Sequence, residues 1–285
     1  MSTDLNVSKI KSLINKKGKA ITVMIGNQKG GVGKTANTTL IAYTMAKLGI
    51  NTLVADMDPQ SNATKILTLT KSQNSDQIYT IDKTMMRGVQ EHDLTDLPIN
   101  VMPNLDLLPS NTDFDNFPRY VYKTTDNQYD EDHILAPLFE PLKEKYEIIL
   151  IDTPPHNSEI DKNAPVFCDY VLISLQTEED SLVGANEFIK ALVKIKKRYD
   201  LPVEVVGILP MMRDKKGSVD KKVLAESYST FGKENVFNTI ISRMQRIKRF
   251  PFNGITNNDK FDRNVLDMYS KVTNELINRI IEFEE

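Results

Sequence analysis

The sequence has very little cysteine and no long hydrophobic run. Its 285 residues include one cysteine, Cys168, and three histidines. One cysteine cannot form a disulfide within the chain, and so few cysteines and histidines argue against a Cys/His zinc site. No stretch approaches roughly 18 apolar residues, and the first residues lack the apolar core of a signal peptide. We therefore expect neither a membrane span nor a secretory leader, and a reducing compartment fits this composition.

Linker-like and low-complexity segments are also missing. The 12 glycines and 13 prolines are spread along the chain, 40% of the residues are hydrophobic and 26% are charged. A chain of this length and composition can bury a sizeable core without disulfide or metal cross-links. We expect a short polar, lysine-rich N-terminal arm over residues 1–19 and a single domain over residues 20–285.

Short β-branched runs alternate with helical patterns along the chain. The runs that indicate strands cover residues 21–25, 52–55, 105–109, 147–152, 170–175, 203–209 and 236–241. Helical patterns cover residues 35–48, 182–198, 218–231 and about 265–280. This alternation predicts an α/β fold with a mostly parallel twisted sheet and helices on both faces. Residues 71–132 are polar and acid-rich, and we expect irregular structure with short helices there.

A glycine-rich loop directly follows the first predicted strand. Its sequence is Lys29-Gly30-Gly31-Val32-Gly33-Lys34-Thr35, and a predicted helix begins at its end. Glycines let consecutive backbone N–H groups turn inward around a phosphate at a helix N-terminus. In such loops a lysine, here Lys34, contacts the β- and γ-phosphates, and a hydroxyl, here Thr35, binds Mg²⁺. The pattern predicts a P-loop nucleotide site. It departs from the strict motif at Gln28, where a glycine is usual, and by its additional lysine, Lys29.

Carboxylates follow or end two of the predicted strands. Asp56 and Asp58 follow residues 52–55, and Asp152 ends the run 147–152. A carboxylate at the end of such a strand commonly holds Mg²⁺ or its bound water in P-loop proteins. Asp56 and Asp58 stand two residues apart and point the same way, so the sequence does not separate their roles. Both could also serve only to form the turn before Pro59.

Together these motifs resemble the deviant Walker A ATPases of the ParA/MinD class. Residues 29–35 are similar to the signature loop of that class, and residues 54–64 to its second motif, with the core Asp-x-Asp-Pro-Gln-x-Asn. The strand that ends at Asp152 resembles its Walker B strand. The resemblance covers Ile21 to Phe283. The Asp-Pro-Gln element favours the ParA-type plasmid partition ATPases, especially the small plasmid-encoded ones of Gram-positive bacteria, over MinD.

The resemblance implies ATP and Mg²⁺ as cofactors and gives roles to the motif residues. Thr35 would bind Mg²⁺ directly, Asp152 would hold a Mg²⁺-bound water, and Asp58 would orient the attacking water close to the metal. Lys34 would serve its own subunit. Lys29 would reach across an ATP-dependent homodimer to the phosphates of the partner, in the manner of an arginine finger.

Two further parts of the nucleotide site are less well defined. Ala36 stands where the family usually has a second threonine or serine, so backbone N–H groups would have to contact the α-phosphate there. In similar proteins the adenine lies between the loops after the last two strands, here residues 210–213 and 242–244. Met211 and Met212 are therefore candidate adenine contacts, although methionine at such positions also fills cores.

Positive charge is concentrated in one part of the chain. Residues 187–249 contain 15 lysines or arginines and 7 aspartates or glutamates, a local charge of +8 in a chain of net charge −3. Such segregation can mark a surface for a polyanion, or only solvated helix faces. The densest cluster is formed by Arg243, Arg246, Lys248 and Arg249. The resemblance implies non-specific DNA binding by the ATP-bound dimer. We predict this cluster as the DNA contact, and the cluster of Lys194, Lys196, Lys197 and Arg198 is the alternative.

The resemblance also implies a small centromere-binding adaptor of the ParB type, a cytoplasmic and nucleoid-associated location, and no membrane contact. A MinD-like membrane-associated positioning ATPase is the main alternative. It needs a basic amphipathic C-terminal helix, whereas this chain ends in Glu282-Phe283-Glu284-Glu285. A P-loop metabolic enzyme is the second alternative. An iron–sulfur reductase is excluded because it needs two cysteines per subunit.

Overall fold

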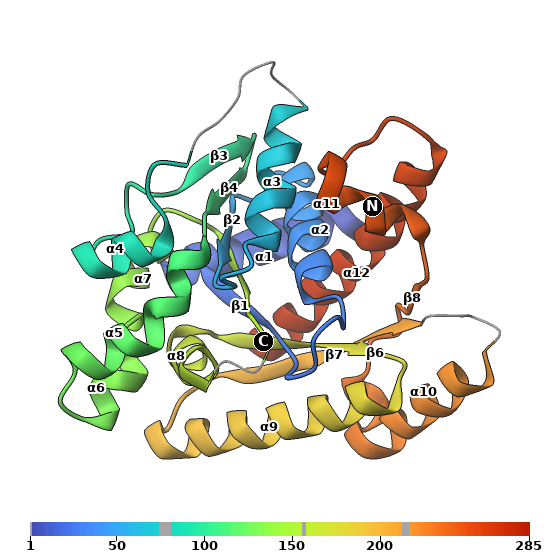
Figure 1. Cartoon of the computed structure of the whole chain (residues 1–285). Helices are drawn as coiled ribbons and strands as arrows, with labels where there is room; N and C mark the ends of the chain where they lie inside the picture. Colours follow the sequence, from blue (N-terminus) through green and yellow to red (C-terminus); the bar gives the residue numbers. More distant parts are fainter. Residues whose placement is uncertain (1, 74–80, 156–157, 213–216) are drawn as a thin grey trace.

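The computed structural model describes residues 2–73, 81–155, 158–212 and 217–285 (Figure 1). At its centre is an eight-stranded sheet with the order β3-β4-β2-β5-β1-β6-β7-β8. The strands are β1 Ile21–Gly26, β2 Thr52–Asp56, β3 Ile99–Met102, β4 Leu105–Leu108, β5 Ile148–Asp152, β6 Tyr170–Gln176, β7 Glu204–Met212 and β8 Ile241–Ser242. Neighbouring strands pair in parallel except β3 and β4, which are antiparallel.

Helices cover both faces of this sheet (Figure 1). They are α1 Ser2–Lys17, α2 Lys34–Lys47, α3 Asn62–Ser72, α4 Met85–Glu91, α5 Phe117–Thr124, α6 Gln128–His133, α7 Ala136–Lys143, α8 Ser158–Phe167, α9 Glu179–Tyr199, α10 Ser218–Phe231, α11 Phe250–Asn253 and α12 Lys260–Glu284. The described residues also form three 3₁₀ turns, η1 Thr112–Asn116, η2 Lys233–Asn235 and η3 Gln245–Arg249. No described helix is apolar over a stretch long enough to cross a bilayer.

Two hydrophobic clusters lie on the opposite faces of the sheet. Along β1, Val23 and Ile25 belong to the cluster with α1, α2, α3 and α12, whereas Met24 belongs to the cluster with α4, α5, α7, α8 and α9. This division follows from the strand period of two, which sends successive side chains to opposite faces. The α/β fold predicted from the sequence, a mostly parallel sheet with helices on both faces, is confirmed.

The two edges of the sheet differ from expectation. β3 was not anticipated within the polar segment 71–132, where it pairs with β4 across a turn at Asn104 (φ +65°). At the other edge the strand predicted over 236–241 is reduced to a bridge at Val236 and the two residues of β8. The backbone N–H groups of Asn238 and Thr239 donate instead to the carboxylate of Glu275 on α12, so they are not available to a strand.

The N-terminal segment forms a helix that packs on the core. α1 lies against α12, and its Ile10 and Ile14 are buried in the same cluster as that helix. Lys17 Nζ, near the end of α1, lies 2.5 Å from Asp169 Oδ1 and 3.7 Å from Glu284 Oε1. α1 is therefore docked on the core, and its polar residues form its outer side. The division into an arm of residues 1–19 and a domain of residues 20–285 stays a prediction.

Candidate nucleotide site

The phosphate loop joins the end of β1 to the start of α2. Gly33 precedes the first residue of α2 with φ +87°, a conformation that glycine adopts without strain. A Cβ atom at Gly33 would also collide with Met211 Sδ. The free N–H groups of the first turn of α2 face the loop, and such a helix N-terminus attracts anions.

Asn27 fixes the beginning of the loop. Its Nδ2 donates to the carbonyl oxygens of Ser174 (2.8 Å) and Ser181 (3.2 Å), and its Oδ1 accepts from the N–H of Lys29 (2.8 Å). α9 comes so close at Gly184 that a Cβ there would lie 2.7 Å from Asn27 Oδ1. No local pattern marks Asn27, because the carbonyl oxygens that it binds are about 150 residues away in sequence.

The two lysines of the loop have different surroundings. Lys34 is 6% exposed, and its Nζ lies 3.0 Å from the carbonyl oxygen of Asn27 and 3.3 Å from that of Lys29. Burial lowers the pKa of Lys34, and the nearby negative charge of Asp152 opposes that shift. A phosphate in the loop would act in the same direction as Asp152 and favour the charged ammonium.

Lys29 instead lies at the surface beside α9. Its Nζ is 2.8 Å from Asp180 Oδ2 in the first turn of that helix, and the two side chains are 35% and 77% exposed. The hydrogen bond from Lys29 lowers the pKa of the exposed Asp180 carboxyl. An exposed pair of this kind contributes little free energy, so Lys29 can exchange its partner readily.

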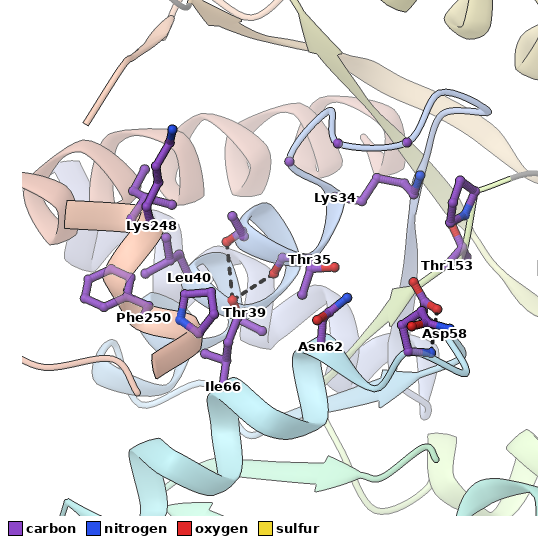
Figure 2. Close-up of a pocket in the computed structure, with 18 residues that line it drawn as sticks. Lys34, Thr35, Thr39, Leu40, Asp58, Asn62, Ile66, Thr153, Lys248 and Phe250 are labelled. Carbon is purple, nitrogen blue, oxygen red and sulfur yellow. Dashed lines mark hydrogen bonds between the residues drawn. The ribbon is translucent and has the colours of Figure 1, made fainter. Parts of the chain in front are cut away.

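A pocket of about 440 Å³ opens on one side of the loop (Figure 2). Figure 2 shows Lys34, Asp58 and Thr153 at one end of it and Lys248 and Phe250 at the other, with Thr35 between them. Thr153 directly follows β5 and donates its hydroxyl to the carbonyl oxygen of Ile25 (2.9 Å). The ends of β1, β2 and β5 thus bring the motif residues together with a segment from the C-terminal part of the chain.

The structure separates the surroundings of Asp56 and Asp58. Asp56 is fully buried, and its Oδ2 accepts from both the N–H and the hydroxyl of Thr64 at 2.8 Å. Its Oδ1 accepts from the N–H of Asp58 (3.0 Å), and burial raises the pKa of Asp56 to about 6. Asp58 accepts from the N–H of Gln60 (2.9 Å) and lines the pocket. Asp56 therefore ties β2 to α3, and only Asp58 borders the space where a phosphate would lie.

Asp152 ends β5 with one oxygen unpaired. Its Oδ1 accepts from the hydroxyl of Thr38 (3.0 Å), whereas Oδ2 is buried without a hydrogen-bond partner among the described residues. Burial, followed by the charge of Asp56, raises the pKa of Asp152 to about 8, and the hydroxyls of Thr35 and Thr38 oppose that shift. A buried carboxylate oxygen with a spare lone pair beside Thr35 fits a hydrated Mg²⁺ ion.

A metal here would need ligands beyond the protein carboxylates. Among the described residues no group of three or more His, Cys, Asp or Glu side chains could hold a metal ion. Mg²⁺ usually keeps several waters and takes substrate phosphate oxygens as ligands, so Thr35, water and a phosphate would complete its shell. Asp152 and Asp58 are then the carboxylates available to its waters.

A second pocket, of about 760 Å³, also borders the loop. Loop residues form part of its wall. The rest comes from Gln176 at the end of β6, Met211 on β7, Ser242 on β8, and Arg243, Met244 and Lys248 in the segment after β8. Met211, a predicted adenine contact, lines this pocket. Met212 pairs with Ser242 through the backbone, and its side chain and residues 213–216 lie outside the described part of the chain. Ala36 lines both pockets.

The basic cluster before α12 is not uniform. Arg243, Lys248 and Arg249 are exposed. The side chain of Arg246 is 17% exposed and forms ion pairs with Asp259 and with Asp262 Oδ1, the latter at 3.2 Å. Arg246 therefore anchors η3 to the start of α12, which argues against it as a DNA contact. Lys248 lines both pockets and Arg243 lines the second, so two of the exposed cations border the nucleotide site.

Known proteins are similar to this chain over most of its length. The profile of the AAA domain family matches residues 19–205. The Bacillus subtilis sporulation initiation inhibitor protein Soj is 28% identical over 81% of this chain and 88% of its own. The Myxococcus xanthus chromosome partitioning protein ParA is 30% identical over 80% of this chain and 77% of its own.

A solved structure agrees with these sequence matches. A putative plasmid partition protein from Borrelia burgdorferi, bound to AMPPNP, superposes with a TM-score of 0.70 at 25% identity, over 89% of this chain and 98% of its own. The residues that the family profile matches include the phosphate loop and the strands that end at Asp56 and Asp152. The chain therefore belongs to the AAA domain family of P-loop proteins, in the group that contains the ParA chromosome partitioning proteins.

Proposed function

We propose that this protein is a ParA-type ATPase for active partition of plasmid DNA. ATP drives two copies together, the dimer binds DNA of any sequence, and hydrolysis of ATP to ADP and phosphate resets the cycle. One observation carries the proposal. The loop has two lysines, of which Lys34 is buried under its own loop and Lys29 is partly exposed in a weak pair with Asp180. A loop already served by Lys34 has no need of Lys29 within the subunit.

ATP and Mg²⁺ are the proposed cofactors. The AMPPNP-bound relative supports ATP, and the unpaired Oδ2 of Asp152 beside Thr35 supports Mg²⁺. Mg²⁺ supplies charge neutralisation at the phosphates when bound. Backbone N–H groups of residues 30–36 would surround the phosphates, including that of Ala36 near the α-phosphate, and Val32 would contribute its N–H. The pocket beside Met211 would take the adenine.

Three side chains would perform the hydrolytic step. Asp58, which borders the pocket, would orient the water for attack on the γ-phosphate. Lys34 would hold the β- and γ-phosphates from its own subunit. Lys29 of one protomer would leave Asp180 and stabilise the charge that develops at the nucleotide of the other protomer. Since Lys29 is partly exposed and Asp180 is exposed, the exchange breaks only a weak pair.

Non-specific DNA is the proposed ligand of the dimer. The exposed cations Arg243, Lys248 and Arg249 would contact phosphates, for which only positive charge at suitable spacing is needed. Lys248 borders the nucleotide pockets, which supports a dependence of DNA binding on the nucleotide. A small ParB-type adaptor that binds the centromere would stimulate hydrolysis. We propose a cytoplasmic, nucleoid-associated location without membrane contact.

The direct test compares DNA binding by the ATP and ADP forms. We expect the purified protein with ATP and Mg²⁺ to bind unrelated DNA duplexes with similar affinity at low salt, and the ADP form to bind much more weakly. Liposomes of anionic lipid are the parallel arm. Binding to liposomes but not to DNA would support a MinD-like membrane ATPase instead. Binding to neither, with turnover that depends on a small acceptor, would support a metabolic enzyme.

A further inference from the structure

A buried chain of hydrogen bonds joins the C-terminal helix to the phosphate loop. The hydroxyl of Tyr269 on α12 lies 2.9 Å from Asn37 Oδ1 on α2. Asn37 Nδ2 lies 2.9 Å from Ser174 Oγ on β6, and that oxygen lies 2.6 Å from the carbonyl oxygen of Val32 in the loop. Tyr269, Asn37 and Ser174 are each 0% exposed. These groups form one continuous path from α12 into the loop.

The last acceptor fixes the direction of every hydrogen bond in this path. A carbonyl oxygen only accepts, so Ser174 donates its proton to Val32 and its own oxygen accepts from Asn37. Asn37 must then present its NH₂ group to Ser174 and its oxygen to Tyr269. The hydroxyl of Tyr269 therefore donates. All donors run in the same direction, an arrangement in which each hydrogen bond polarises the next.

The path fixes the orientation of one peptide unit in the phosphate cradle. A trans peptide is planar, so the carbonyl of Val32 and the N–H of Gly33 point in opposite directions. Ser174 holds the carbonyl towards the buried core. The N–H of Gly33 consequently points out of the core, where the glycine-rich loop is open to a phosphate.

We propose that Tyr269 is a positioning residue for the phosphate loop, acting through Asn37 and Ser174. The inference rests on the proposed function only in that the loop binds a nucleotide. Packing alone does not account for the hydroxyl, because phenylalanine would fill the same space without a polar atom to desolvate. The sequence gives no sign of this role, since Tyr269 stands 232 residues from Asn37.

The test measures ADP affinity in variants that remove single links. Tyr269→Phe removes only the hydroxyl, and Ser174→Ala removes the bond to Val32. Tyr43→Phe is the matched control, because it makes the same chemical change at a buried tyrosine of α2 that lines a different pocket. From the usual net value of one hydrogen bond, we expect Tyr269→Phe and Ser174→Ala each to weaken ADP binding about fivefold at 25 °C, and Tyr43→Phe to leave it unchanged.

Two further readouts separate positioning from stability. A loss of global stability lowers the melting temperature but leaves the Kd of a folded variant unchanged. Amide hydrogen exchange over residues 27–35 in the nucleotide-free protein should become faster in Tyr269→Phe and Ser174→Ala, and not in Tyr43→Phe. This exchange measurement needs no nucleotide, so it tests the positioning even if the wild-type protein binds none and the proposed function fails.

The double variant tests whether the two residues act along one path. If they do, Tyr269→Phe with Ser174→Ala weakens ADP binding by about the same factor as Ser174→Ala alone. Multiplied effects, about 25-fold for the pair, would mean that they act independently and would overturn the relay. Wild-type affinity and wild-type loop exchange in Tyr269→Phe would overturn the positioning role altogether.

Discussion

The nucleotide site and the basic loop, which is residues 243–249 with the basic cluster, border the same pocket. Their charged side chains are held in opposite ways. The nucleotide site consists of buried groups, such as Lys34, Asp56 and Asp152, whose charges lie at the ends of adjacent strands. In the basic loop three cations are exposed, and only Arg246 is tied down, by ion pairs to the start of α12. Buried charges respond to protonation and to single substitutions, whereas exposed charges respond to salt. The two regions should therefore fail under different perturbations.

α12 contacts both regions. Asp262, near its start, pairs with Arg246 of the basic loop, and Tyr269, seven residues later, begins the hydrogen-bond path to the phosphate loop. Seven residues are about two helical turns, so both side chains leave α12 on nearly the same side. A single rigid helix thus supports the nucleotide site and the proposed DNA surface, which connects the two regions physically.

The largest difference should separate the two lysines of the loop. Lys34→Ala should weaken ATP binding at least about 100-fold, because a buried charge with two carbonyl contacts and the phosphates as partners is removed. Lys29→Ala should bind ATP nearly as well as wild type and lose hydrolysis. Equilibrium titration with a fluorescent nucleotide and phosphate release give the two values. Equal loss of nucleotide binding in both variants would remove the distinction between the lysines.

The next largest difference should be between the effects of replacing Asp58 and Asp56. Asp58→Ala should bind ATP and accumulate as a stable dimer with little phosphate release, because the water loses its orienting carboxylate while Thr35 and Asp152 remain. Asp56→Ala should instead lower the melting temperature, since Thr64 loses both of its hydrogen bonds to that carboxylate. Sedimentation with ATP and thermal melting without it measure the two effects. Normal turnover in Asp58→Ala would transfer the role to another residue.

Salt dependence distinguishes the cations of the basic loop. For each DNA phosphate that the protein no longer neutralises, the slope of log affinity against log salt should fall by about 0.9, twice over in a dimer. Arg243→Ala with Lys248→Ala should therefore flatten the salt dependence on every DNA sequence. Arg246→Ala should change the slope less and lower the melting temperature, because it leaves the buried Asp262 without its cation.

A matched control is available elsewhere on the surface. Lys194 and Lys197 on α9 are also exposed, and replacing both by alanine removes the same charge from a different place. If this pair flattens the salt dependence and the pair in the basic loop does not, the DNA surface lies on α9.

The last effect concerns pH. Burial raises the pKa of Asp161 on α8 from 3.8 to about 7, although the charge of Lys34 opposes the shift. The folded protein then keeps a proton that the unfolded chain has lost, so stability falls as the pH rises from about 4 to about 7. Asp161→Asn should remove this component, which is at most about 1.4 kcal/mol per pH unit. Thermal melting of the nucleotide-free protein across this pH range measures the effect. Identical slopes of stability against pH in the wild type and in Asp161→Asn would contradict the prediction.

The sequence predicted those parts of the molecule that depend on local patterns. β1, the phosphate loop and α2 follow one another, so glycines and β-branched residues were sufficient to predict them. β3 was missed because Ile99–Met102 is a short edge strand in a polar segment. β8 was overestimated because Glu275 of α12, distant in sequence, binds the backbone that would have extended it.

The functional site, too, could be predicted only where a local sequence pattern marks its residues. Asp58 and Asp56 could not be separated until Thr64 was seen to bind Asp56. Asn27 and Tyr269 are single polar residues whose partners lie far along the chain, and no local pattern marks them. Arg246 looked like its basic neighbours, since its pairing with Asp259 and Asp262 arises only from the docking of α12.

The action of Lys29 at the nucleotide of the partner subunit can be tested directly by mixing two variants. Lys29→Ala and Asp58→Ala are each expected to be inactive as homodimers, so they are mixed in equal amounts before ATP is added. In a mixed dimer the Asp58→Ala protomer supplies Lys29 to the protomer that retains Asp58, which completes one of the two sites. Random pairing in a two-fold dimer predicts recovery of about one quarter of the wild-type rate of phosphate release. If Lys29 acts within its own subunit, the mixture stays as inactive as its components, and that result would contradict the account.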